Sequence, residues 1–338
     1  VGLGADLTAA AAVRARGYDP ADDLRRAAAC GARLVGPSDD EWPAHRLTWT
    51  GGGQLQPPPL SLYVRGPHRL DEAVERSVAV VGARAATSYG AHVATEMARS
   101  LAARGWTVVS GGAYGIDVAA HRGALLAEAA PTVAVLACGV DVAYPRGNDR
   151  VLGQVAQRGL VVSEVPPGSH PLRRRFLVRN RLIAALSVGT VVVEAASRSG
   201  SLATVDRART LHRHVMAVPG SVTSAMSSGC HQQLRLGAVC VGSADEVLDQ
   251  VAPVGSALAL PPRGPDTARD ALSDTVRRVL DAVPVRRGAG VTTLARDAGV
   301  TVLVVQQVLP PLLAHGLVER TDEGWRLTAL GAGRPAPR

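Results

Sequence analysis

Short apolar runs alternate with longer amphipathic segments through the middle of the chain, and this alternation constrains the fold more than any other feature. Each run lacks polar alternation, which is typical of a strand buried on both faces of a parallel sheet. Segments such as Tyr89–Arg104 lie between the runs and carry apolar residues at four-residue spacing, which predicts helices. The runs are SVAVVG (77–82), TVVS (107–110), TVAVLA (132–137), LVVS (160–163), GTVVVEA (189–195), HVMAVPG (214–220) and AVCVG (238–242). Strands and helices in this order predict an α/β fold with a Rossmann-like, doubly wound, mostly parallel sheet.

Composition changes divide the chain into four predicted parts. Residues 1–66 are predicted to form a small N-terminal helical and lead-in segment, and residues 67–250 the sheet domain. Residues 251–272 are rich in Pro, Gly and Ala, which predicts a linker.

Residues 273–330 are predicted to form a small winged-helix domain. Thr292 or Thr293 can cap a short helix that ends at Ala298, and a hairpin is predicted around Glu323-Gly324. The helix between them contains Pro310-Pro311, which is expected to break or kink it. It carries no Arg, so packing or a protein partner is a better prediction for it than DNA.

Several classes of protein are disfavoured by composition. No apolar stretch reaches the roughly 18–20 residues that cross a bilayer, and no secretory signal pattern opens the chain. The four cysteines form no CxxC pair and no zinc-ligand spacing. We therefore expect a cytoplasmic protein with no membrane partner, no metal and no cofactor.

The formal net charge is +8, which favours a polyanionic partner. All 37 basic residues are Arg, a bias that weakens this evidence unless the positions of the arginines support it. Residues 77–250 hold 17 Arg against 11 acidic residues, whereas residues 273–330 hold 7 against 6. The basic character therefore lies in the sheet domain.

Three glycine-rich turns follow predicted strands, at the sheet edge where such folds bind ligands. The first spans Gly82–Gly90 and includes Arg84, the second spans Ser110–Asp117, and the third spans Ser199–Thr204 and offers hydroxyl groups. Turns of this kind can direct backbone N–H groups and a helix N-terminus at phosphate. None has the GxGxxG or GxxxxGK[ST] pattern, so a dinucleotide dehydrogenase and a P-loop ATPase are both disfavoured.

The segment SHPLRRRFLVRNRLIAALS (169–187) gathers five arginines around Phe176, the only phenylalanine of the chain. Guanidinium groups for phosphates and a ring for base stacking are what a single-stranded nucleic-acid site needs. The alternative is a solvated basic helix face, and the predicted place at the sheet edge favours binding.

Asp117 and His121 are four residues apart on one predicted helix and share a face. They form either a catalytic pair or a capping Asp with a packed His. The second interpretation is favoured, because the sequence shows no nucleophile or third orienting group beside them.

These motifs, in this order, resemble those of the DNA-processing protein A family (DprA, also called Smf). The matching elements are Val81–Arg84, Tyr89-Gly90, Ser110–Asp117 with Ala120-His121, Tyr144–Asn148, Arg179–Ser187, Glu194–Thr204, Val218–Gly220 and Gly229-Cys230. The similarity extends over most of residues 31–250. It implies a Rossmann-like core that binds single-stranded DNA, forms a homodimer and helps to load a RecA-type recombinase during natural transformation.

We therefore expect a DNA-binding recombination mediator with no catalytic residues. The alternative is a nucleotide N-glycosidic hydrolase of the lysine-decarboxylase-like (cytokinin-activating) type, since Glu194 beside the third turn resembles the site of that group. A third hypothesis, a genome-maintenance role in an organism that is not transformable, is not distinguished from the first by sequence. The predicted DNA- and phosphate-binding residues are Gly82, Arg84, Ser110, Gly111, Gly115, Arg146, Asn148, Arg173, Arg175, Phe176, Arg179, Asn180, Arg181, Ser199, Gly200, Ser201 and Thr204.

Overall fold

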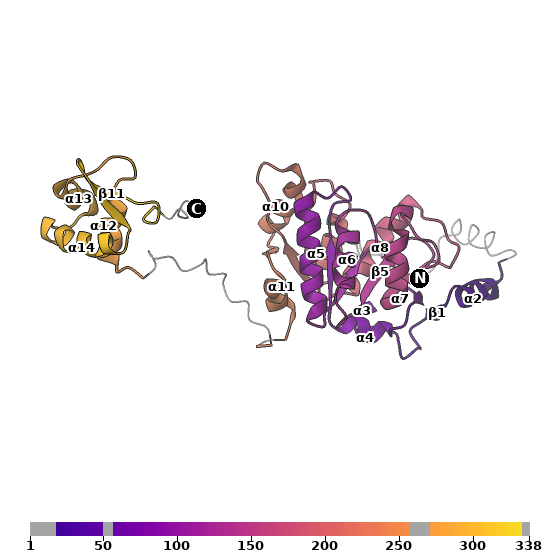
Figure 1. Cartoon of the computed structure of the whole chain (residues 1–338). Coiled ribbons are helices and arrows are strands. Elements are labelled where there is room, and N and C mark those ends of the chain that lie inside the picture. Colours follow the sequence, from indigo (N-terminus) through magenta and orange to yellow (C-terminus); the bar gives the residue numbers. More distant parts are fainter. Residues whose placement is uncertain (1–17, 50–56, 254, 257–268, 270, 333–338) are drawn as a thin grey trace. The chain divides into compact units, whose positions relative to one another are not determined.

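A computed structural model of the chain describes residues 18–49, 57–253, 255–256, 269 and 271–332 (Figure 1). The chain divides into two compact units, Val1–Ala259 and Leu260–Arg338. The division falls within the stretch that the sequence predicts as a linker. Each unit is described by itself below.

The first unit is built on a nine-stranded sheet in the order β1-β2-β6-β5-β4-β3-β7-β8-β9. All pairings from β6 to β9 are parallel, whereas β1 pairs with β2, and β2 with β6, antiparallel. The prediction of a mostly parallel α/β sheet is confirmed. The strands are β1 (Ala32–Val35), β2 (Leu62–Arg65), β3 (Ser77–Val81), β4 (Thr107–Ser110), β5 (Thr132–Leu136), β6 (Leu160–Ser163), β7 (Gly189–Val192), β8 (His214–Ala217) and β9 (Val239–Cys240).

Helices cover both faces of this sheet, as the buried strand patterns require. On one face, Val78 and Val80 of β3 pack in a core with α5 (Ser88–Ala103), α6 (Ile116–Leu125) and α11 (Ala244–Val251). On the other face, Ala79 and Val81 pack in a core with α4 (Leu70–Glu75), α8 (Arg173–Ala185) and α9 (Leu202–Thr210). Helix α7 (Asp149–Arg158) covers β5 and β6, and α10 (Ser228–Arg235) lies against β8. Figure 1 shows α5 and α6 side by side.

The segment before the parallel strands departs from the helical prediction. It contains α2 (Pro20–Ala29) and the four-residue helix α3 (Ala44–Leu47), but also β1 and β2, which extend the sheet beyond β6. Residues 1–17 of the predicted helical stretch lie outside the described residues. Arg33 interrupts the apolar residues of β1 and Arg65 ends β2 after three residues, so neither strand stands out as an apolar run.

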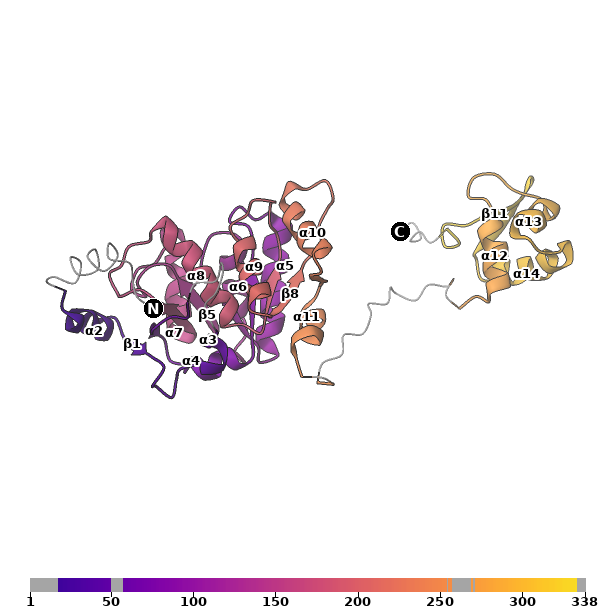
Figure 2. The same cartoon turned by 180° about the vertical axis from the view of Figure 1, so that it is seen from behind.

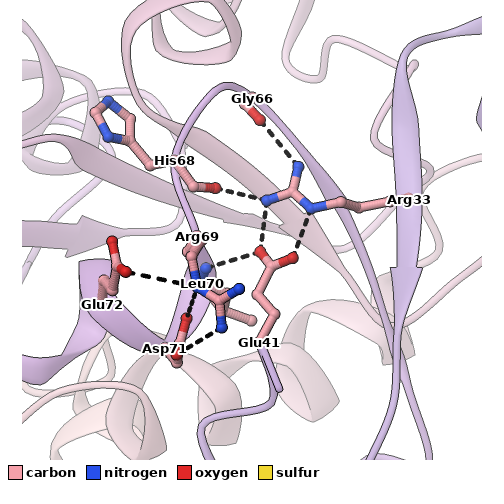
Figure 3. Close-up of polar contacts among 8 residues, drawn as sticks. All are labelled: Arg33, Glu41, Gly66, His68, Arg69, Leu70, Asp71 and Glu72. Atoms are coloured by element: carbon pink, nitrogen blue, oxygen red, sulfur yellow. Dashed lines mark hydrogen bonds and ion pairs between the residues drawn. The ribbon is translucent and has the colours of Figure 1, made fainter. Parts of the chain in front are cut away.

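One arginine ties this segment to the rest of the sheet domain (Figure 3). Arg33 on β1 forms a bidentate ion pair with Glu41, with Nε 2.7 Å from Oε2. The same guanidinium donates to the carbonyl oxygens of Gly66, just after β2, and His68. Glu41 also accepts the backbone N–H of Leu70, the first residue of α4, at 2.8 Å. The ion pair therefore links β1, the segment that carries Glu41, the end of β2 and the start of α4.

The described part of the second unit contains three helices and a hairpin around one apolar core. The elements are α12 (Asp274–Ala282), α13 (Val291–Ala298), α14 (Val302–Ala314), β10 (Val318–Thr321) and β11 (Gly324–Leu327). The hairpin is where the sequence places it. A winged-helix identity for the unit stays a prediction.

Two expectations about this unit are wrong. Helix α13 begins after Gly290 without a side-chain cap, so neither Thr292 nor Thr293 caps it. Helix α14 runs unbroken through Pro310 and Pro311, so the expected break does not occur, while a kink stays a prediction. A proline leaves the carbonyl four residues earlier without its usual donor, but Gln306 and Gln307 are exposed, so water can hydrate those two carbonyls.

Among the described residues, no single helix has the length and apolar character to cross a membrane. Only α13 and α14 taken together reach that length, and they are bent by 104°.

The Arg33–Glu41 pair is expected to stabilise the sheet domain measurably. Glu41→Ala leaves the guanidinium without its carboxylate and the N–H of Leu70 without its acceptor, so the free energy of unfolding should fall by about 1–3 kcal/mol. Chemical denaturation followed by circular dichroism measures this change.

Glu72→Ala is the matched control. Glu72 pairs with Arg69 in the same region, but its side chain is 73% exposed. Exposed pairs contribute about 0–1 kcal/mol, so this variant should unfold almost as the wild type does. Equal losses in both variants would contradict the role assigned to Arg33 and Glu41.

Candidate nucleic-acid interface

The connections of the sheet create a crevice at the carboxyl ends of its central strands. The chain moves from β3 outward through β4, β5 and β6, and then returns to place β7 on the other side of β3. Ligands of doubly wound sheets bind at such a switch point. A pocket of about 840 Å³ lies here, lined by the turns after β3 and β7, the first turns of α8, and parts of two further loops.

Three side chains contact one another in a row on the wall of this pocket. The guanidinium carbon of Arg84 lies 5.2 Å from the centre of the Phe176 ring, a cation–π distance. The ring of Tyr144 lies 5.7 Å from the same ring at an interplanar angle of 53°. Arg84 and Tyr144 are exposed and Phe176 is half-buried, so cationic and aromatic surface is open to a ligand.

Arg179 forms the floor of the pocket rather than its rim. Its side chain is buried, and Nη1 donates to the carbonyl oxygens of Gly111 at 2.7 Å and Val135 at 2.5 Å, just after β4 and within β5. Burial lowers the pKa of the guanidinium, and the nearby Asp117 carboxylate opposes that shift. Arg179 therefore supports the fold of the pocket, and its replacement is expected to cost stability.

Asp117 holds the opposite side of the same turn. Its Oδ2 accepts the backbone N–H groups of Gly111 at 3.2 Å and Ala113 at 3.4 Å. Burial raises the pKa of Asp117, while the Arg179 charge and these two hydrogen bonds lower it. Gly111 thus gives its carbonyl to Arg179 and its N–H to Asp117.

A carboxylate also occupies the first glycine-rich turn. Glu194 is buried and accepts the N–H of Thr87 at 2.9 Å and its hydroxyl at 2.7 Å, at the start of α5. The donors of Thr87, Gly111 and Ala113 are therefore already used, and the prediction that they hold phosphate is wrong. Glu194 is the acid required by the hydrolase alternative, and here it serves as a buried cap.

The third turn is the one that stays open to the pocket. Ser201 precedes α9 and makes no side-chain capping bond, and its hydroxyl lies 2.8 Å from that of Ser199. Gly200 is exposed, and Asn180 donates to its carbonyl oxygen at 3.3 Å. The hydroxyl groups and the helix start can receive an anion at this point.

The structure brings ten of the predicted site residues together and leaves seven elsewhere. The pocket is lined by Gly82, Arg84, Arg173, Phe176, Arg179, Asn180, Ser199, Gly200, Ser201 and Thr204. The predicted residues that do not line it are Ser110, Gly111, Gly115, Arg146, Asn148, Arg175 and Arg181.

Three of those seven have buried side chains that support the fold. Ser110 donates to the carbonyl oxygen of Val80, and Asn148 donates to that of Gly112. Arg181 pairs with Glu164 at 2.6 Å and is 4% exposed. Direct DNA contact through these side chains is therefore a wrong prediction.

Two of the predicted glycines are required by close packing between the turn after β3 and α6. A Cβ on Gly82 would lie 2.5 Å from Cγ1 of Ile116. Gly115 has φ +76°, and a Cβ there would lie 2.2 Å from the carbonyl oxygen of Ala83. Their function is to let the turn and the helix approach each other.

The remaining arginines differ in how free they are. Arg173 is exposed at the pocket and Arg146 is exposed outside it, while Arg175 donates to the carbonyl oxygen of His170 at 2.7 Å. The sequence analysis missed Arg198 and Leu177, both exposed and both lining the pocket. Arg198 directly precedes the third turn, and that position was the signal that could have identified it.

His121 is a packed, hydrogen-bonded residue of the core, which is the interpretation that the sequence favours. It is fully buried, and burial lowers its pKa to about 3, so it is neutral at pH 7. The hydroxyl of Thr132 donates to the carbonyl oxygen of Val108, so it accepts a hydrogen bond from Nδ1–H of His121 at 2.8 Å. Within the described part of the chain, no group of three or more His, Cys, Asp or Glu residues is arranged to hold a metal ion.

Comparisons with known proteins agree on one family. The family model described as DNA recombination-mediator protein A matches residues 33–252. The chain is 48% identical over 326 residues to the DNA processing protein DprA of Mycobacterium tuberculosis, across 94% of this chain and 82% of that protein.

Two solved structures are similar to the chain. The X-ray structure of DNA processing protein A from Streptococcus pneumoniae matches with a TM-score of 0.61 and 35% identity, over 70% of this chain and 80% of that one. A structure of the Helicobacter pylori protein, described for the single-stranded DNA binding mode of that protein, matches with a TM-score of 0.55 and 29% identity. It aligns with 64% of this chain and 94% of that one.

Arg179→Met is expected to destabilise the sheet domain. It would remove the Arg179 donor from the carbonyls of Gly111 and Val135 and the Arg179 charge from the buried Asp117, so the free energy of unfolding should fall by about 3 kcal/mol or more. Denaturant titration measures the loss.

Arg173→Met is the control on the same helix, because Arg173 is exposed. A change within about 0.5 kcal/mol is expected for it. If both variants unfolded at the same denaturant concentration, Arg179 would not be a positioning residue of the pocket floor.

Proposed function

The chain belongs to the DNA recombination-mediator protein A family, and from this premise we propose that it binds single-stranded DNA in the pocket at the carboxyl edge of the sheet. One observation carries the proposal. Exposed guanidinium groups surround the exposed ring of Tyr144 and the half-buried ring of Phe176 in an open pocket at the switch point.

Phosphate contacts are assigned to the free cations of the pocket. Arg84, Arg173 and Arg198 line it and are exposed, and none forms an ion pair within the part of the chain that the structure describes. Guanidinium groups recognise phosphate oxygens through forked hydrogen bonds. The hydroxyl groups of Ser199 and Ser201 add neutral donors beside them.

Base contacts are assigned to the aromatic pair. Phe176 and Tyr144 offer ring surface within the pocket, and every base has a π face that can stack on a ring. A strand whose bases are already unpaired can present that face at no unpairing cost. Duplex DNA cannot, so the geometry favours a single strand.

The pocket supports binding better than hydrolysis. Splitting an N-glycosidic bond needs a carboxylate that is free to act on the substrate. Asp117 and Glu194 both accept hydrogen bonds from backbone N–H groups of neighbouring turns, which occupies them in the fold. A non-enzymatic role is therefore proposed.

The finer role follows from the family premise. We propose that the protein acts as a homodimer, holds single-stranded DNA and delivers it to a RecA-type recombinase, as in natural transformation. These partners imply action in the cytoplasm, which belongs to the same proposal. Strand-exchange assays in which the recombinase is added with and without this protein test it.

Arg84→Ala is expected to weaken binding to a labelled single-stranded oligonucleotide about tenfold, because one charge-assisted phosphate contact is lost. The slope of log affinity against log salt should also fall by about one contact. Fluorescence anisotropy across a salt series measures both quantities.

Arg122→Ala serves as the control, since Arg122 is exposed on α6 and does not line the pocket. Its affinity and salt slope should match those of the wild type. Binding that is unchanged in Arg84→Ala would place the DNA site elsewhere. Release of free adenine from AMP by the wild type would instead support the hydrolase alternative.

Phe176→Leu is expected to lower single-strand affinity by about 1–3 kcal/mol, because base stacking is lost while apolar volume is largely kept. Leu177→Ala is the control, because Leu177 is 58% exposed and lines the same pocket without a ring. A melting curve separates the roles: a large fall in melting temperature with unchanged affinity would make Phe176 a packing residue.

A further inference from the structure

A second pocket of about 470 Å³ lies beside the first at the carboxyl edge of the sheet, where β7 and β8 end. Glu194 and Pro219, which follow these two strands, form part of its wall. We call it the serine pocket. Strand β8, which leads into it, and helix α5, which carries one of its residues, are labelled in Figure 2. Its hydroxyl-bearing residues, none of which has a role in the proposed function, are Thr87, Tyr89, Ser221, Ser224 and Ser227.

Three chain segments line both pockets, so the two pockets are neighbours. The turn after β3 reaches the first pocket with Gly82–Ala85 and the serine pocket with Thr87 and Tyr89. The segment after β7 and the 3₁₀ helix η2 (Ala225–Ser227) also contribute residues to each. A polymer held in the first pocket can therefore extend into the serine pocket.

One hydroxyl group of the serine pocket is unused by the fold. Ser227 is only 4% exposed, and its side chain forms no hydrogen bond with any residue that the structure describes. Its Oγ lies against the backbone of Gly220, since a Cβ on Gly220 would be 2.2 Å from it. Buried hydroxyl groups in proteins nearly always have a partner. The Ser227 hydroxyl therefore marks a place where a ligand can supply a hydrogen-bond donor or acceptor.

Tyr89 offers an aromatic surface at the same pocket. Its Oη donates to the carbonyl oxygen of Pro219 at 2.7 Å, which ties the start of α5 to the segment after β8. The residue is nevertheless exposed. A ring that is already held at its hydroxyl end loses little freedom when a flat ligand stacks on it, so the entropic cost of binding is small.

The charge of the serine pocket disfavours phosphate as its ligand. Among the described residues, no arginine or histidine lines this pocket, whereas the acidic residue Glu194 does. A phosphate group would be repelled by that charge and would find no cation. An uncharged flat group with N–H and carbonyl groups at its edge matches both the ring and the hydroxyls.

We propose that the serine pocket binds a nucleobase, which stacks on Tyr89 and forms a hydrogen bond with the Ser227 hydroxyl at its edge. The base belongs either to the DNA strand held in the first pocket or to a free deoxynucleoside, and both present the same ring. The continuity of the two pockets favours the strand, and this assignment rests on the proposed function.

The first test is photo-crosslinking of the full chain to single-stranded oligonucleotides that carry 5-iododeoxyuridine, a base that links covalently to an aromatic ring on which it stacks. Mass spectrometry of the digested complex should place crosslinks on Tyr89 as well as on Phe176 or Tyr144. Crosslinks on Phe176 or Tyr144 without Tyr89 would exclude the strand as the source of the base and leave the proposed function intact. Crosslinks on none of the three rings would contradict the proposed function itself.

Binding of a long single strand measures the contribution of the ring. Tyr89→Leu should weaken it about tenfold, because one stacking contact is lost. The slope of log affinity against log salt should stay unchanged, because no phosphate contact is lost, and this separates the variant from Arg84→Ala. Tyr89→Phe is the matched control: it keeps the ring and should bind nearly as tightly as the wild type.

Ser227→Ala isolates the unused hydroxyl. Its removal should leave the melting temperature unchanged, because the hydroxyl has no partner in the described fold, but should weaken binding of the base about fivefold. Ser228→Ala is the control, since Ser228 donates to the carbonyl oxygen of Ala225 at 2.7 Å and does not line the serine pocket. A Ser227→Ala variant that loses stability and keeps its affinity would make Ser227 a packing residue and overturn its assigned contact.

Free deoxyadenosine separates the two sources of the base. With the strand as the source, Tyr89 is crosslinked and the free nucleoside changes the melting temperature little. With a free nucleoside as the source, millimolar deoxyadenosine should raise the melting temperature of the wild type, Ser227→Ala should reduce that rise, and the strand should not be crosslinked to Tyr89. The proposal is overturned if Tyr89 is not crosslinked and the nucleoside gives no shift.

Discussion

The hydrogen bonds that hold the turn after β4 fix the geometry of the binding edge. Gly111 gives its carbonyl to Arg179 and its N–H to Asp117, so both backbone polar groups of this residue are bound by buried charged side chains. A Cβ on this residue would lie 2.1 Å from Nη1 of Arg179, so any other residue would displace the guanidinium group that holds the carbonyl. Arg179 belongs to α8, so this contact also fixes the rotation of that helix. Phe176 lies three residues earlier on the same helix face, where it meets Arg84.

In the site, the carboxylates are buried and the arginines that are free to bind a ligand are exposed. Asp117 and Glu194 are buried and satisfy backbone donors of the second and first glycine-rich turns, a task that a bound phosphate performs in many sheets of this class. The cations that remain for a ligand lie at the surface around the rings. A polymer with regularly spaced phosphates can use such a dispersed set, whereas a single small anion gains most from converging donors.

Much of the fold can be predicted from the sequence, because a strand that is buried on both faces of the sheet is encoded as a continuous apolar run. All seven predicted runs contain strands, and the turns after β3 and β7 line the pocket as predicted. Strands β1 and β2 leave no such trace, since their stability comes from pairing and from Arg33. The arginines of α8 show another feature that the sequence does not predict. Arg173 and Arg179 are chemically identical, and only the rotation of the helix decides which one is buried. That rotation is set by contacts with Gly111 and Val135, far away in sequence.

The double-sided hold on Gly111 has a consequence for how the protein can change over time. Gly111, Asp117 and Arg179 form an epistatic unit, because altering one leaves the other two with unmet polar groups in the interior. A lineage that drifted at one of them would pass through a poorly folded intermediate. The exposed cations Arg84, Arg173 and Arg198 do not depend on one another in this way. Substrate preference can therefore evolve at the rim of the pocket while the buried residues beneath it stay constant.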